Sequence, residues 1–166
     1  MYAVKHDGAA GHWMNVALFN WSDKPEDKTI DLQALGFHAG IHLHAFDFWE
    51  EKYFPVEAGV LEFKQIPPHG CKLLRFCEAD GKPCLVGDTL HTAQGAEITE
   101  WRSSATNLSI TTLDLEREAT GSLWLWLPQE PTKVTVTGKP GSFKVQDGLS
   151  HIPLTFTGNA QVNLDW

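Results

Sequence analysis

The stretch Val16-Ala-Leu-Phe-Asn-Trp-Ser22 decides how the first half of this chain folds. A short apolar run that ends in Asn and Ser predicts a buried strand followed by a turn. Downstream, Asp31-Leu-Gln-Ala-Leu-Gly36 predicts one short helical turn closed by its glycine. Ala45-Phe-Asp-Phe-Trp-Glu50 then predicts a further strand that runs into a hairpin connection. This order is typical of an antiparallel β-domain.

The same pattern continues along the chain, because short or alternating apolar runs are separated throughout by Gly, Pro, Asn and Asp. Strands that recur about every 8–12 residues predict an all-β fold, either a sandwich or a barrel. The strands are expected at residues 13–21, 28–32, 41–47, 51–54, 60–66, 71–78, 85–90, 96–102, 107–115, 121–128, 133–137, 142–145, 151–156 and 160–166.

A break in the pattern at Ala79-Asp-Gly-Lys-Pro83 indicates the domain organisation. The run before it has the character of a closing strand, and new strands begin after it. We therefore expect two antiparallel β-sandwich-like units packed in tandem, at residues 1–79 and 80–166. A single sandwich of all the predicted strands fits this break less well.

Composition excludes several classes of function. The 166 residues are 42% hydrophobic and include seven Trp and nine Phe, enough for a substantial core. The net charge of −8 argues against nucleic acid and anionic membranes as main partners, since both require clustered Lys and Arg.

The cysteines and the N-terminus bear on localisation. Cys71, Cys77 and Cys84 match no common zinc spacing, and their odd number favours free thiols in a reducing, cytoplasmic compartment. The N-terminus lacks the apolar core of a signal peptide and begins as if within a strand, which favours a piece of a larger protein. No apolar run reaches the roughly 20 residues of a membrane-spanning helix.

Two groups of polar residues are candidates for a metal site or a catalytic site. His42 and His44 share one face of a predicted strand, but no further metal ligand stands at a recognisable spacing. We expect a solvent-facing or loosely packed pair and no metal. Asp47, Glu50 and Glu51 resemble the paired carboxylates of glycosidases, yet turn chemistry in a hairpin connection explains them, so no catalytic residue is assigned. No motif for a cofactor is present.

Tryptophans are the candidate ligand-binding residues. Leu123-Trp-Leu-Trp-Leu127 places Trp124 and Trp126 on one face of a strand and three leucines on the other. The Trp face could cover the first unit, a catalytic domain or a sugar ring. Trp49 is expected to be a buried or half-buried staple of its turn, with sugar stacking as the alternative. Together with Trp101 these residues form the candidate carbohydrate-binding set.

The first half resembles a known family. The stretches that carry the resemblance are Val16-Ala-Leu-Phe-Asn-Trp-Ser22, Ile30-Asp-Leu-Gln-Ala-Leu-Gly36, Ala45-Phe-Asp-Phe-Trp49 and Ile66-Pro-Pro-His-Gly70 with Leu73-Leu-Arg75. Their order is similar to that of the C-terminal antiparallel β-domain of melibiase-type α-galactosidases and related glycoside hydrolases. Residues 80–166 look like an additional β-module that follows this domain in some members.

The resemblance implies a non-catalytic region, because the catalytic carboxylates of the family lie in a (β/α)₈ barrel that this chain does not contain. The leading hypothesis is an accessory β-module that stabilises a glycosidase catalytic domain, in cis or in trans. A stand-alone carbohydrate-binding β-sandwich is the alternative. A third reading, an independent β-sandwich enzyme, would require a site that the sequence does not reveal.

Overall fold

A computed structural model describes all residues from Met1 to Trp166, and its secondary structure consists of sixteen β-strands. The all-β prediction is confirmed. The chain divides into two compact units: Met1–His6 with Trp13–Asp80 form the first, and Asp7–His12 with Gly81–Trp166 form the second. No element is a helix of the length and hydropathy that crossing a membrane by a helix requires.

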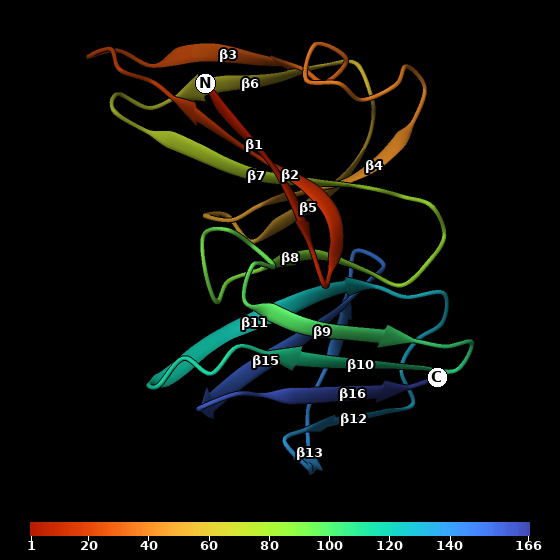
Figure 1. The fold of residues 1–166 in the computed structure, drawn as a ribbon. Coiled ribbons are helices and arrows are strands. Elements are labelled where there is room, and N and C mark those ends of the chain that lie inside the picture. Colours follow the sequence, from red (N-terminus) through yellow and green to blue (C-terminus); the bar gives the residue numbers. More distant parts are fainter. The chain divides into compact units, whose positions relative to one another are not determined.

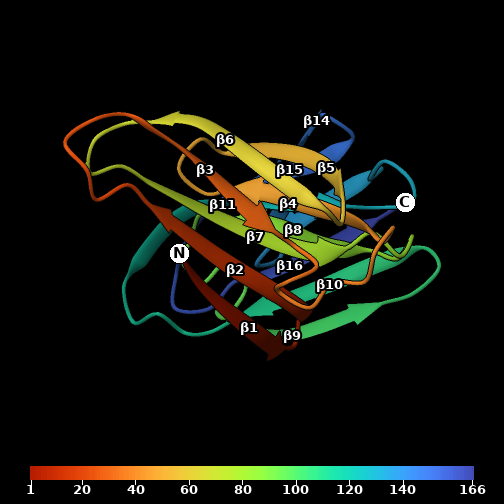
Figure 2. The same cartoon turned by 90° about the horizontal axis from the view of Figure 1, so that it is seen from above.

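The first unit is built on a five-stranded sheet with the strand order β1-β2-β7-β4-β5 (Figure 1). Its strands are β1 (Tyr2–Gly8), β2 (Gly11–Phe19), β4 (His42–Asp47), β5 (Lys52–Glu57) and β7 (Cys71–Glu78). A separate ribbon consists of β3 (Glu26–Asp31) and β6 (Val60–Ile66), which pair antiparallel. Figure 2 shows this ribbon lying over one face of the sheet.

The core of the first unit lies between the sheet and the ribbon. Alternate residues of β2, β4 and β7 point to it, as the period of two in a strand requires. Ile30 and Leu61 of the ribbon pack against them from the other side. The main buried contributors from the sheet are Met14, Val16, Leu18, Leu43, Ala45, Leu74 and Phe76.

The opposite face of the sheet carries Trp13, whose indole is stacked on His6 at 4.8 Å between ring centroids. The guanidinium of buried Arg75 lies 4.4 Å from the Trp13 ring, a cation–π contact. At the far edge of the sheet, β5 contains Pro55, which has no N–H to donate. An edge strand is the place where a sheet tolerates proline.

Asn20 joins two bends of the first unit. Its side-chain nitrogen points at the carbonyl oxygens of Lys24 at 2.7 Å, Ile66 at 2.9 Å and Pro67 at 3.0 Å. Its side-chain oxygen accepts from the N–H and the hydroxyl of Ser22, both at 3.0 Å. Because Asn20 is fully buried, these bonds are not shared with water, and they fix the turn after β2 to the Pro-Pro-His-Gly turn before β7.

The predicted helical turn at residues 31–35 is present as a single turn. The Asp31 carboxylate accepts from the backbone N–H groups of Gln33 and Ala34 at 3.0 and 3.1 Å. Gly36 then reverses the chain with a φ of +102°, a conformation that favours glycine. Side-chain capping by Asp31 and the placement of Gly36 are therefore enough to explain this bend.

The second unit consists mainly of two antiparallel sheets (Figure 1). One has the order β13-β12-β16-β10-β9, from β9 (Ile98–Ser103), β10 (Asn107–Thr112), β12 (Lys133–Val136), β13 (Lys139–Pro140) and β16 (Gln161–Asp165). The other has the order β14-β15-β11-β8, from β8 (Cys84–Asp88), β11 (Glu118–Trp126), β14 (Lys144–Gln146) and β15 (Leu149–Thr157).

The core of the second unit takes inward residues from both sheets, as in a sandwich. The alternation of apolar and polar residues in 133–137 and 161–165 predicts that Val134, Val136, Val162 and Leu164 point inward. Val134, Val162 and Leu164 are buried in this core, and Val136 is partly buried and packs against it. The leucines at positions 123, 125 and 127 are also buried in this core.

Two strands of the structure, β1 and β13, are absent from the strand ranges predicted above, although the N-terminus was expected to begin as if within a strand. Nearly every residue of β1 is exposed, so the strand lacks the alternation of apolar and polar residues that marks a half-buried strand. β13 is only two residues long. Strands of these two kinds leave no periodic signal.

Replacing Asn20 should destabilise the first unit. Asn20→Ala leaves three backbone carbonyls without their donor, so the free energy of unfolding should fall by about 3 kcal/mol. Urea denaturation followed by circular dichroism measures this loss. Asn107, which is exposed and also starts an Asn-x-Ser triplet, provides the control: Asn107→Ala should change stability by less than about 0.5 kcal/mol. Equal effects of the two substitutions would contradict the role given to Asn20.

Candidate functional site

The turn between β4 and β5 presents Trp49 to solvent. The Asp47 carboxylate accepts from the backbone N–H groups of Trp49 at 3.1 Å and Glu50 at 3.3 Å, and Glu51 follows with a φ of +48°. The hairpin connection inferred from the sequence is confirmed. The expected burial of Trp49 is wrong, because the residue is 60% exposed. Its ring meets Phe48 edge to face at 4.8 Å instead of packing into the core.

An ion-pair cluster holds this turn against β7. The Lys72 ammonium group donates to Asp47 at 2.9 Å and also bonds to Glu50. Partial burial opposes the charged form of Lys72, but its bonds to Glu50 and Asp47 outweigh burial and raise its pKa. The acidic residues of the turn therefore serve its architecture, and the backbone that carries Trp49 is fixed from both sides.

A second group of exposed rings lies where β1 begins and β2 ends. Tyr2 is 67% exposed and meets Phe19 edge to face, with 6.0 Å between ring centroids. Trp21 is 71% exposed and stacks on Phe19 at 5.1 Å with an interplanar angle of 17°. One face of the Trp21 indole is thus covered by Phe19, and the other face is open.

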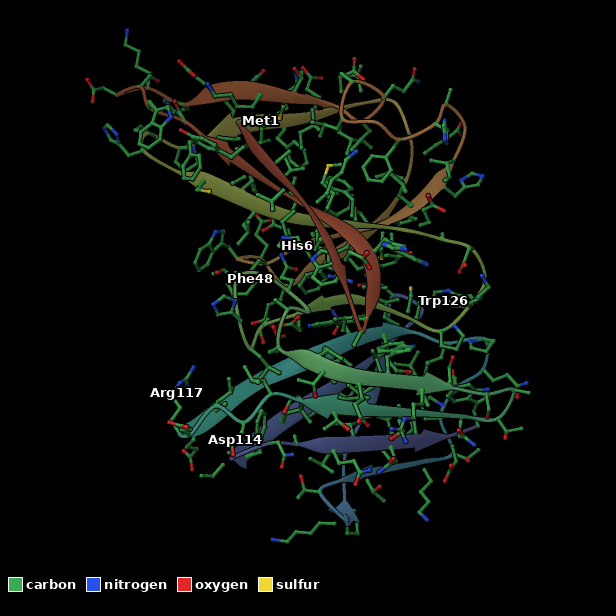
Figure 3. All side chains as sticks on the ribbon, viewed as in Figure 1. Met1, His6, Phe48, Asp114, Arg117 and Trp126 are labelled. Atoms are coloured by element: carbon green, nitrogen blue, oxygen red, sulfur yellow. The ribbon has the colours of Figure 1, made fainter.

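Cys71 connects these two groups of rings. It lies directly opposite Phe19 in the β2–β7 register, so the two side chains share a face of the sheet. Burial and the charge of Asp47 raise the pKa of Cys71, and a hydrogen bond from the Trp49 side chain partly offsets them. We call the resulting set, Tyr2, Phe19, Trp21, Phe48 and Trp49, the aromatic surface. Figure 3 labels Phe48 within it and Met1 at the start of β1.

The other tryptophans of the candidate carbohydrate-binding set lie in the second unit and are less accessible than Trp49. Trp124 is only 3% exposed and stacks on His151 at 4.2 Å, so its ring offers no surface for a ligand. Trp101 is half-buried and packs against the core. Trp126 is also half-buried. Among the four residues, only Trp49 has a mostly exposed indole.

The histidine pair of β4 is split between solvent and interior. His42 is exposed as expected, but His44 is buried, which corrects the expectation of a solvent-facing or loosely packed pair. The Nδ1 atom of His44 lies 3.0 Å from the Tyr53 hydroxyl across the β4–β5 pair. Burial lowers the pKa of His44, and the Asp80 carboxylate opposes this shift.

No group of three or more His, Cys, Asp or Glu side chains is arranged to hold a metal ion. The three cysteines are free thiols, with Cys77 buried and the others half-buried. The best-defined candidate site of this chain is therefore the aromatic surface. The sequence pointed to it at Trp49 but missed Trp21, whose signal was its place directly after the apolar run, in a turn that must face solvent.

Removing the Trp49 side chain should cost little stability. Trp49→Ser should lower the free energy of unfolding by less than about 1 kcal/mol, because an exposed ring leaves no cavity. Leu74→Ala, which empties a fully buried position in the same sheet, should cost about 3 kcal/mol. Chemical denaturation of both variants measures the difference. A loss for Trp49→Ser as large as that for Leu74→Ala would show that this ring is part of the core.

Stability should fall as the pH decreases below about 6.5, the ordinary pKa of histidine. The pKa of His44 is lowered in the folded state, so the unfolded chain takes up a proton first and is favoured in acid. His44→Gln should reduce the fall in unfolding free energy between about pH 7 and pH 5. His42→Gln should leave it unchanged, since His42 is exposed. Urea denaturation midpoints are measured from about pH 7 to pH 5, and their slope against pH is compared between the wild type and the two variants. A slope in His44→Gln equal to that of the wild type would show that His44 does not contribute to the pH dependence.

Comparison with known proteins relates part of this chain to a family. No curated protein is found to match this sequence. Residues 6–76 match the family model described as the alpha galactosidase C-terminal beta sandwich domain. The match spans most of the first unit, and of the second unit it includes only Asp7–His12. The predicted resemblance is confirmed: residues 6–76 are similar to the C-terminal β-sandwich domain of α-galactosidases.

Proposed function

We propose that this chain is a non-catalytic accessory β-module of an α-galactosidase-like glycoside hydrolase, and that its first unit packs against a catalytic domain, in cis or in trans, and stabilises it. The observation that carries the proposal is the aromatic surface, which lies on the unit that matches the family. Rings as exposed as Tyr2 and Trp49 are a liability in a protein that has no partner for them.

The rigidity of this surface supports a role in docking. The backbone at Trp49 is held by Asp47, which is itself held by Lys72, so the turn that carries the ring is ordered before a partner arrives. Binding then costs little side-chain and loop entropy. Aromatic anchors of this kind carry a large share of the energy at protein interfaces.

The acidic residues of the turn support the non-catalytic part of the proposal. A glycosidase needs two carboxyl groups that are free to donate and accept protons at the sugar. Asp47 is buried and engaged by two backbone N–H groups and Lys72, and Glu50 is bonded to the same lysine. The matched family model is that of a β-sandwich domain, which is a different fold from a catalytic barrel.

Docking is tested by adding the full chain to the (β/α)₈ barrel of an α-galactosidase whose own C-terminal domain has been removed. At a concentration about a hundredfold above Kd, binding should stabilise the barrel by about 2.7 kcal/mol, which calorimetry detects as a rise of several degrees in Tm. The variants Tyr2→Ser and Trp49→Ser should each weaken Kd about tenfold.

Val145→Ser is the matched control, because Val145 is an exposed apolar residue of the second unit. It should leave Kd unchanged. Failure of the wild-type chain to raise the Tm of the barrel would overturn the docking proposal. So would an equal loss of affinity in the control.

A stand-alone carbohydrate-binding β-sandwich remains the second candidate. The exposure of Trp49 and Trp21 favours it, because an open indole face is a surface on which a sugar ring can stack. Docking on a catalytic domain and stacking of a sugar can use different faces of these indole rings.

A further inference from the structure

Trp21 belongs to the aromatic surface, and its turn also carries exposed polar residues that are not part of that surface. Two residues further along the chain, the Asp23 side chain is 96% exposed, and one of its carboxylate oxygens lies 3.0 Å from Nε2 of His69. His69 is itself 64% exposed and comes from the turn before β7. We call Trp21, Asp23 and His69 the Trp21 corner.

One face of the Trp21 indole is open to a ligand. Phe19 stacks nearly parallel to Trp21, so the free face is the one turned away from Phe19. A ligand on that face would not need to displace Phe19. The Trp21 corner therefore shares Trp21 with the aromatic surface but uses the face of its indole that Phe19 does not cover.

The corner is pre-organised by buried hydrogen bonds. Asn20 immediately precedes Trp21 and binds Ser22, Ile66 and Pro67, which join the two bends that carry Trp21, Asp23 and His69. The N–H of Asn20 also donates to the carbonyl of Gly70 at 2.9 Å. At Gly70 an added Cβ would lie 2.8 Å from Pro67, so only glycine fits there. Neither bend has to be ordered by a ligand.

The chemistry of the corner matches a pyranose ring. Such a ring has a face of C–H groups, which is attracted to the negative face of an indole, and a rim of hydroxyl groups. An ionised carboxylate accepts hydrogen bonds from hydroxyls, and imidazole nitrogens donate or accept them. The contact between Asp23 and His69 uses one carboxylate oxygen and Nε2. It therefore does not use the second oxygen of Asp23 or the Nδ1 atom of His69, which can bond to a ligand. We propose that the Trp21 corner binds a hexopyranose, stacked on Trp21 and hydrogen-bonded by Asp23 and His69.

Other ligand classes fit less well. The Asp23 carboxylate repels phosphate and sulfate groups, and the chain as a whole carries a net charge of −8. The corner combines one ring with highly exposed polar groups, whereas a protein anchor sits within a dry apolar surround. At Trp49 the indole bonds to Cys71, and the nearby Glu50 and Lys72 bond to each other. The polar groups there are already engaged.

The test is a titration of the full chain with methyl α-galactoside, methyl α-glucoside and a soluble galactomannan, followed by the indole N–H signals in NMR spectra. A single open site should bind a monosaccharide with a Kd of about 1 mM. The Trp21 indole signal should shift on saturation, and Trp21→Ala should abolish binding. Trp21 is exposed, so this variant should fold as the wild type does.

Three variants separate the site from its surroundings. Asp23→Asn and His69→Ala should each weaken Kd about tenfold, since the first replaces a charged carboxylate acceptor with a neutral amide and the second removes a hydrogen-bonding group. Trp49→Ala should leave the sugar affinity unchanged. Absence of saturable binding of all three carbohydrates at tens of millimolar would overturn the proposal, and so would a loss of binding in Trp49→Ala but not in Trp21→Ala. No catalytic domain is present in these titrations, so their outcome is independent of the docking experiment.

Discussion

The hydrogen bonds of Asn20 are the constraint on which the first unit depends. A buried amide that satisfies three carbonyls and accepts from one serine converts two loops into one rigid element. These loops are far apart in the sequence, at residues 20–24 and 66–70, and they flank the sheet strands β2 and β7 that pair with each other. One side chain thus holds together the bend after β2, which carries Trp21, and the bend before β7.

In the first unit, the exposed aromatic rings lie on turns that hydrogen bonds hold rigid. An exposed ring on a mobile loop would collapse onto the nearest apolar surface or lose entropy when it binds. Here the turn of Trp49 is closed by Asp47 and Lys72, and that of Trp21 by Asn20. The buried polar groups keep in solvent rings that the hydrophobic effect would otherwise bury, and both proposed functions depend on these exposed rings.

Much of the fold could be predicted because its signals are local. The alternation of residues in β12, β16 and β11 identified their inward faces, and Gly36 marked its bend. The site was harder to predict, since exposure of a ring depends on what the fold places around it. Trp49 was expected to be a buried or half-buried staple of its turn because large aromatic residues usually gain from burial, whereas the turn presents the ring to solvent. His44 was misjudged for the converse reason: a polar residue became buried because Tyr53, on the neighbouring strand, supplied a hydrogen-bonding partner.

Pro55 has a consequence for how copies of this protein can associate. The five-stranded sheet of the first unit has two edges, β1 and β5, and on β5 the proline ring interrupts the row of backbone donors. Strand β1 retains a complete row of N–H groups. A sheet that can be extended at one edge but not at the other permits pairing between two molecules and then stops. Through this sheet, edge-to-edge association is therefore favoured at β1 and opposed at β5, and pairing of two molecules through β1 uses up the open edge.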